Sequence, residues 1–245
     1  MARLFGNDGD NRLNGTSVAD LIYGRSGDDT IQGFGGNDTI YGGEGNDVIY
    51  AGAGNNLVHG GSGNDRIWAA GGNDRIFAGE GNDLVFAGAG NNRVVGGEGN
   101  DTLNAGNGRD TMEGGSGNDR MFSNGGDDIL FGGEGDDLMV AGGGNDRLRG
   151  GEGNDTLNGG AGNDLMTGGE GADRFVFNGG RDRITDFENG DDQIDLSSFA
   201  AINSFSNIRA AATQQGSDVV INIGPNSLVI EDFRLSQMNA EDFIW

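Results

Sequence analysis

A nine-residue pattern repeats along this chain without an insertion, and it constrains the fold more than any other feature of the sequence. Stepping by nine from Asn11 to Asp182 gives 20 positions, of which 17 are Asp and three are Asn. Two residues earlier, 19 of the 20 positions are Gly, with Val18 the exception. Two residues after each acidic position, beginning at Leu4 and ending at Ile184, all 21 positions are Leu, Ile, Val, Met or Phe. Since only 34% of the residues are apolar, this column is not a product of chance.

Each nine-residue unit has the form of one short strand followed by one turn. The apolar positions never recur three or four residues apart, which excludes an amphipathic helix. A segment such as Arg66-Ile67-Trp68 places one buried side chain between two outward ones, as in a minimal strand. The remaining Gly, Asn and Asp residues favour a turn. Two units therefore form an 18-residue coil, and about ten coils stack, at about 4.8 Å each, into an all-β, parallel β-roll.

The repeat also predicts two columns of carboxylates. Because successive units alternate between the edges of the roll, Asp29, Asp47 and Asp65 lie on one edge, while Asp20 and Asp38 lie on the other. Neighbouring carboxylates would stand only about 5 Å apart, and like charges this close resist ionisation unless a cation lies between them. Carboxylate and turn carbonyl oxygens are hard donors that suit Ca²⁺ better than Mg²⁺ or zinc.

The unit Gly42-Gly43-Glu44-Gly45-Asn46-Asp47-Val48-Ile49-Tyr50 resembles the calcium-binding repeat of RTX, or hemolysin-type, proteins. The resemblance extends over residues 4–190. It implies multiple calcium ions held between successive turns by Asp carboxylates and turn carbonyls. The three Asn residues keep an oxygen but lose a charge, so the sites that they share are expected to be weaker. The candidate metal ligands are Asn11, Asp20, Asp29, Asp38, Asp47, Asn56, Asp65, Asp74, Asp83, Asn92, Asp101, Asp110, Asp119, Asp128, Asp137, Asp146, Asp155, Asp164, Asp173 and Asp182.

The charge and composition exclude several functions. The net charge of −24, from 39 acidic and 15 basic residues, is unsuited to nucleic acid or to an anionic membrane surface. No apolar run approaches the length of a membrane span, so no membrane insertion is expected. The chain has no Cys, and His59 is its only His. H-E-x-x-H zinc-protease and Cys-His sites are therefore impossible, and His59 stands at an outward strand position within an aromatic column, so we expect no enzyme.

A different segment follows the repeats, and we divide the chain into a roll over residues 1–190 and a C-terminal part over residues 191–245. After Asp182 the register slips by one residue. A short helix is expected at 203–212, followed by strands at 218–223 and 228–232 that are joined by a turn at 224–227. This hairpin is expected to cover the open edge of the last coil, as solenoids require.

The C-terminal part also resembles the end of RTX proteins exported by type I secretion. Its similarity lies in residues 171–177, 184–187 and 192–196 and in the ending Asp242-Phe243-Ile244-Trp245. The resemblance implies an uncleaved C-terminal signal, type I secretion machinery as a partner and a secreted, extracellular or cell-surface location. The N-terminus, which lacks the apolar stretch of a signal peptide, fits this route. An ordinary cap is the alternative.

Aromatic side chains form outward columns on both faces. Tyr41, His59 and Phe77 belong to one column, and Tyr50, Trp68 and Phe86 form the other. Such columns favour strand pairing, but a continuous exposed apolar stripe also indicates an interaction site. Leu4 already stands in the core column, so we expect an uncovered strand edge at the start of the roll. Self-association through this edge or through the aromatic faces is the predicted outcome.

Two functions of different kinds remain. The first is a secreted structural protein of a cell surface or matrix that folds and self-associates in calcium. The second is the calcium-folding secretion module of an RTX exoenzyme without its catalytic domain. Ice binding is disfavoured, since no Thr occupies the third loop position, where Glu44, Ala53 and Ser62 stand.

Overall fold

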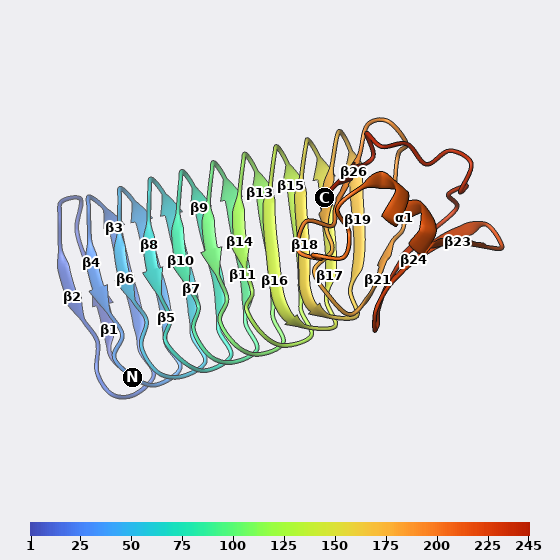
Figure 1. Cartoon of the computed structure of the whole chain (residues 1–245). Coiled ribbons are helices and arrows are strands. Elements are labelled where there is room, and N and C mark those ends of the chain that lie inside the picture. The colour runs from blue at the N-terminus through green and yellow to red at the C-terminus, as the bar shows by residue number, and fades with distance from the viewer.

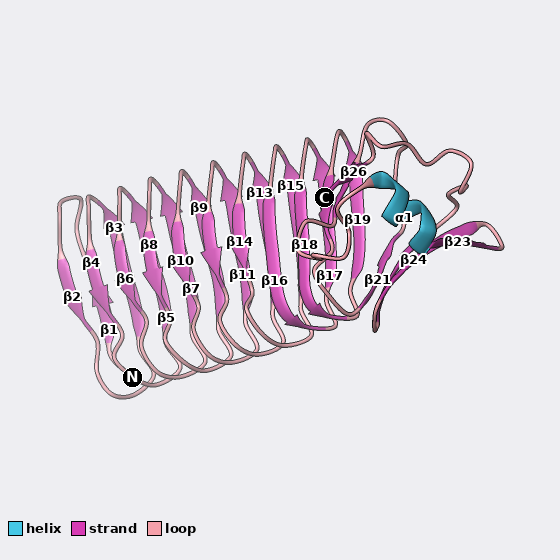
Figure 2. Cartoon of the chain, viewed as in Figure 1, coloured by secondary structure: helices cyan, strands magenta, loops and turns pink.

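The computed structural model describes residues 1–245 as a long parallel β-solenoid with a small cap at its C-terminal end. Strands alternate between two sheets, and equivalent strands in successive turns pair in parallel with a register of 18 residues, as in Ile40↔Val58 and Ile49↔Ile67. The N-terminus lies at one end of the roll, and the only helix lies at the other (Figures 1 and 2). The predicted all-β roll is confirmed, with about eleven turns where about ten were expected.

The strands of the regular roll fall into two series. The first sheet contains β1 (Arg3–Phe5), β3 (Leu21–Ser26), β5 (Thr39–Glu44), β7 (Leu57–Ser62), β9 (Arg75–Glu80), β11 (Arg93–Glu98), β13 (Thr111–Ser116), β15 (Ile129–Glu134), β17 (Arg147–Glu152), β19 (Leu165–Glu170) and β21 (Arg181–Ile184). The second contains β2 (Arg12–Asn14), β4 (Thr30–Gln32), β6 (Val48–Tyr50), β8 (Arg66–Trp68), β10 (Leu84–Phe86), β12 (Thr102–Asn104), β14 (Arg120–Phe122), β16 (Leu138–Gly144), β18 (Thr156–Gly162), β20 (Arg174–Val176) and β22 (Gln193–Asp195).

The core is a single column of side chains from each sheet. In β8, Ile67 is fully buried while Arg66 is exposed and Trp68 is half-buried, and the other strands of the roll repeat this alternation. The first Gly position of the unit also faces inward, because Ala51, Ala69 and Ala87 are fully buried there. A core this thin offers little apolar area for each ordered residue.

The two edges of the roll are built differently. We call edge 1 the turns that follow the strands of the first sheet, which contain Asp29 and Asp47, and edge 2 the turns that follow those of the second sheet, which contain Asp20 and Asp38. Most first-sheet strands run for six residues and continue pairing into the edge 1 turns, whereas most second-sheet strands have three. The repeat pattern predicts three-residue strands throughout and does not indicate this difference.

The cap continues both sheets beyond the repeats. The expected helix is α1 (Phe205–Ala211), and the expected hairpin is β24 (Asp218–Ile223) with β25 (Asn226–Ile230). β25 pairs in parallel with β21, so the hairpin does cover the last coil. Its second strand begins two residues earlier than predicted. Two further strands were not predicted: β23 (Ala212–Gln215), which pairs with β24, and β26 (Phe243–Ile244), which pairs with β22.

The outward aromatic side chains stack as predicted. Phe5, Tyr23, Tyr41, His59 and Phe77 form one series, with neighbouring ring centroids 4.8–5.4 Å apart and planes within 10°. Tyr50, Trp68 and Phe86 form the second series. The ring faces are therefore covered by one another, and mainly the ring edges face outward. The seven-residue helix α1 is far too short to cross a membrane, and there is no other helix.

Candidate metal centre

The Asp residues form a hydrogen-bonded ladder along each edge. On edge 1 the backbone N–H of Asp29 donates to Oδ1 of Asp47, and that of Asp47 donates to Oδ1 of Asp65, both at 2.8 Å. On edge 2 the N–H of Asp20 donates to Oδ1 of Asp38 at 2.8 Å. The predicted division of the Asp residues between two edges is thus confirmed. Each carboxylate crosses from its own coil to the preceding one.

The second carboxylate oxygen of these Asp residues is buried and has no partner. Asp47, for example, is only 1% exposed. A buried anion without a partner is strongly unfavourable. The unpartnered atoms are the Oδ2 atoms of Asp29, Asp38, Asp47, Asp65, Asp74, Asp83, Asp101, Asp110, Asp119, Asp128, Asp137, Asp146, Asp155, Asp164, Asp173 and Asp182.

Backbone carbonyl groups lie beside these oxygens. A methyl group on Gly42 would overlap both Oδ2 of Asp47 and the carbonyl oxygen of Gly60 in the next coil. No three acidic or His side chains gather at one point. Carbonyl oxygens of the turns must therefore supply much of any coordination shell. One carboxylate oxygen among several carbonyls is an all-oxygen donor set, which fits Ca²⁺.

Burial raises the pKa of the ladder Asp residues from Asp29 onward, whereas hydrogen bonds from the backbone of Ala2 and from Thr16 lower that of Asp20. Burial raises the pKa of Asp65 and Asp182 to about 8 and that of Asp47, Asp101 and Asp119 to about 7. The nearby Asp residues of the same column add to this, since like charges disfavour ionisation. Burial thus disfavours the ionised form of these groups, and a neighbouring cation would favour it.

Four predicted ligands differ from this pattern. Asp20, in the first coil, has no free oxygen, because its Oδ2 accepts from the backbone N–H (2.6 Å) and hydroxyl (2.8 Å) of Thr16. Oδ1 of Asn56 and Oδ1 of Asn92 accept the N–H of the ladder residue in the preceding coil, as those of the Asp residues do. Oδ1 of Asn11 instead accepts the N–H of Asn7 in its own turn.

One position of the ladder, or rung, was not among the predicted ligands. Asp192 continues the edge 1 ladder, where its Oδ1 accepts the N–H of Asp173 at 2.9 Å. Its Oδ2 accepts the N–H of Glu188 at 2.8 Å, so it is not left free. The available signal is Ile194, which stands two residues later and pairs with Phe175 in the core column. The one-residue slip of register after Asp182 places Asp192 and Ile194 ten residues after Asp182 and Ile184, and the predicted ligands end at Asp182.

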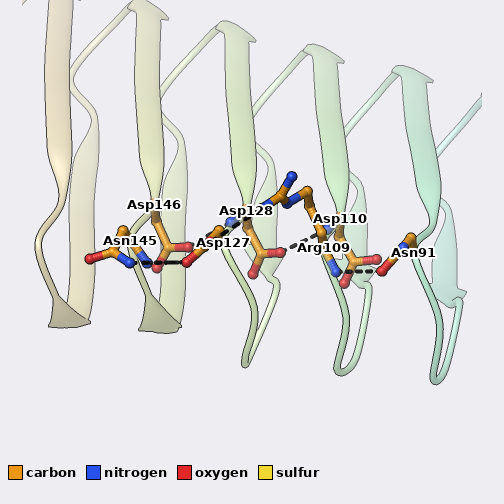
Figure 3. Close-up of polar contacts among 7 residues, drawn as sticks. All are labelled: Asn91, Arg109, Asp110, Asp127, Asp128, Asn145 and Asp146. Carbon is orange, nitrogen blue, oxygen red and sulfur yellow. Dashed lines mark hydrogen bonds and ion pairs between the residues drawn. The ribbon is translucent and has the colours of Figure 1, made fainter.

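A second, outer ladder is formed by the residue before each ladder Asp, and it runs in the opposite sense. Figure 3 shows part of it on edge 2, beside Asp110, Asp128 and Asp146 of the inner ladder. The backbone N–H of Arg109 donates to Oδ1 of Asn91 (2.8 Å), and its guanidinium group donates to Oδ2 of Asp127 (3.3 Å). The outer residues are exposed, so they order the turns without facing a desolvated charge.

Comparisons with known proteins bear on this site. The model of the RTX calcium-binding nonapeptide repeat matches in nine overlapping segments that together cover residues 5–184. A search of curated protein sequences finds no match.

Solved structures with similarity to this chain include the following two. One is the solution structure of the AlgE6R3 subunit of the mannuronan C5-epimerase of Azotobacter vinelandii, at 30% identity over 48% of this chain and 77% of that chain, with a TM-score of 0.40. The other is the crystal structure of the extracellular lipase LipA of Serratia marcescens, at 21% identity over 99% of this chain and 40% of the lipase, with a TM-score of 0.38.

Proposed function

This chain belongs to the family defined by the RTX calcium-binding nonapeptide repeat, and we propose that it binds a column of calcium ions along its edges and needs them to fold. The repeats imply calcium binding, and the nearly all-β solenoid is the matching scaffold. The proposed ligands are the Asp residues of the two ladders, together with carbonyl oxygens of the Gly-rich turns. The role is structural, with no catalytic step.

The observation that carries this proposal is the set of sixteen buried Oδ2 atoms without a hydrogen-bond partner. A bound divalent cation would neutralise these oxygens. Ions that bind only the native state add their binding free energy to folding. The thin core and the net charge of −24 leave the calcium-free chain without comparable compensation.

Circular dichroism with a calcium titration tests this function. We expect a disordered spectrum in excess chelator at neutral pH and a β-rich spectrum at roughly millimolar calcium, the range of extracellular modules. Magnesium at the same concentration is the control and should not restore the β spectrum. Full β content in chelator would refute the proposal.

We further propose that the chain is secreted by a type I system through residues 191–245 and folds where calcium is high. The resemblance of the C-terminal part to exported RTX proteins supports this. A fusion of residues 191–245 to a reporter, expressed with a type I transporter, should export the reporter, and the same fusion without residues 242–245 is the control.

The surface or matrix role rests on self-association, whereas the alternative is the secretion module of an exoenzyme. The two stacked aromatic series, with Tyr50 and Phe86 at 42% and 37% exposure, support lateral association. Analytical ultracentrifugation in calcium should show association that weakens in Trp68→Ser/Phe77→Ser. A strictly monomeric wild-type protein would leave the module as the remaining function.

A further inference from the structure

Two rungs of the edge 2 ladder are filled by amide groups rather than by a free carboxylate oxygen. Nδ2 of Asn56 donates to the carbonyl oxygens of Gly52 (3.1 Å) and Gly54 (3.2 Å) in its own turn. Nδ2 of Asn92 makes the equivalent bonds to Gly88 and Gly90, both at 3.2 Å. It also donates to the carbonyl oxygen of Ala105, in the next coil, at 3.1 Å.

These contacts show which carbonyl groups surround the free oxygen position of a rung. They belong to the residues four and two positions before the ladder residue and to a residue 13 positions after it. Gly60, whose carbonyl lies beside Oδ2 of Asp47, stands at the same 13-residue offset. At an Asp rung, a calcium ion would meet the carbonyl groups at these offsets. At the Asn rungs, the side-chain amide already donates to the equivalent carbonyl groups.

The orientation of both amides follows from their surroundings. Oδ1 of Asn56 accepts the N–H of Asp38 (3.0 Å), and Oδ1 of Asn92 accepts the N–H of Asp74 (2.9 Å). Their Nδ2 atoms face acceptors, namely the carbonyl oxygens described above and the carboxylates of Asp74 and Asp110 in the next coil. Exchanging O and N would therefore break both sets of bonds. The amide supplies two N–H donors and no charge, which satisfies the carbonyl groups without a cation.

We propose that Asn56 and Asn92 fill calcium positions with their own amide groups, so that these two rungs bind no ion and hold their turns together without calcium. This rests on the proposed calcium function and refines it. The expectation from sequence treats both residues as weak ligands, whereas the hydrogen bonds favour a substitute for the ion.

The charge of the two edges agrees with this division. Edge 1 has an uninterrupted Asp column from Asp29 to Asp192, and its third loop position carries Glu at 44, 80 and 98. In the same three coils of edge 2 that position holds Ala53, Ala89 and Asn107, none of which is charged. In these coils calcium is therefore required on edge 1, while edge 2 is partly held by neutral hydrogen bonds.

Counting bound ions tests the inference. The full-length protein is loaded with Ca²⁺ alone, and native mass spectrometry gives the number of ions per chain. We expect Asn56→Asp to bind one ion more than wild type, Asn92→Asp also one more, and the double variant two more. The matched change on edge 1, Asp65→Asn, should bind one fewer and remain folded in calcium.

A further variant tests whether Asn56 binds a calcium ion or takes its place. Asn56→Ala should leave the ion count unchanged and lower the melting temperature of the calcium-loaded protein. An ion lost in Asn56→Ala, or no ion gained in both Asn→Asp variants, would overturn the inference while the calcium function stands. A wild-type protein that binds no calcium would instead refute the proposed function itself.

Discussion

Sixteen of the buried ladder Asp residues use their two carboxylate oxygens differently. Oδ1 bonds the backbone of the preceding coil, as Asp65 does for Asp47 at 2.8 Å, while Oδ2 has no hydrogen-bond partner and is the proposed ligand of a cation. Under this proposal a single side chain couples the stacking of coils to ion binding. Asn keeps the first contact and replaces the second with its amide, as in Asn56.

Two substitutions of Asp65 separate these contributions. Asp65→Ala removes both the acceptor for the Asp47 N–H and the ion ligand, so we expect weaker calcium binding and a loss of about 1–3 kcal/mol of stability in saturating calcium. Asp65→Asn should lose less stability, because an acceptor remains. Chemical denaturation and calorimetry measure both, with the exposed Glu98→Gln as the control for a lost charge. Equal losses in the two Asp65 variants would contradict this.

The raised carboxyl pKa values predict that acid partly replaces calcium. Burial raises the pKa of Asp65 to about 8 and that of Asp74 to about 6, whereas unfolded Asp titrates near about 3.9. Between these values the folded state binds more protons, so the stability of the calcium-free fold is greatest at low pH and falls as pH rises through 6–8. Calcium-depleted protein should show more β signal by circular dichroism at about pH 5 than at about pH 8. The reverse order would contradict the burial of these groups.

At the scale of the elements, the turns differ between the two edges although their sequences share one pattern. Strand pairing continues through the edge 1 turns, as in Gly43↔Gly61 and Glu44↔Ser62. On edge 2 the turns up to Gly125 show isolated bridges such as Gly35↔Ala53, and continuous pairing occurs between β16 and β18, as in Gly142↔Gly160. The close stacking of turn on turn depends on glycine where the backbone adopts positive φ.

Gly61 provides a test of that stacking. It has a φ of 129°, and an added Cβ would overlap the carbonyl oxygen of Gly43 in the preceding coil. We expect Gly61→Ala to lower the free energy of unfolding in saturating calcium by about 1–3 kcal/mol. The control is Gly143→Ala, where an added Cβ meets nothing within 4 Å. Similar thermal midpoints for the two variants would show that the turns adapt to a side chain.

At the scale of the whole molecule, folding and ion loading are expected to be one process. A core one side chain wide cannot hold the coils together against a net charge of −24. The C-terminal cap is the exception, since it packs Phe187 and Phe233 edge to face and adds Ile208 and Phe243 to the core. It can therefore offer a more conventional surface on which the last coil forms.

Small-angle scattering measures this change in size. We expect a radius of gyration of roughly 50 Å for the calcium-free chain at neutral pH, as for an unfolded chain of this length, and near 20 Å in calcium. Magnesium at equal ionic strength controls for simple charge screening. A compact calcium-free chain would show that the core suffices without ions.

The sequence by itself determined the repeat, the alternation of sheets, the buried apolar column and the separation of Asp residues into two edges. These follow from local periodicity, because an uninterrupted nine-residue step leaves one register for every coil. Only the tertiary structure decided which oxygen of each Asp is left free and that Asp192 continues the ladder. It also decided that β26 closes the second sheet and that Asn56 and Asn92 bond the turn carbonyls. Those features depend on the positions of backbone groups in neighbouring coils. The repeat pattern gives the residue type at each position but not where the backbone carbonyl groups lie.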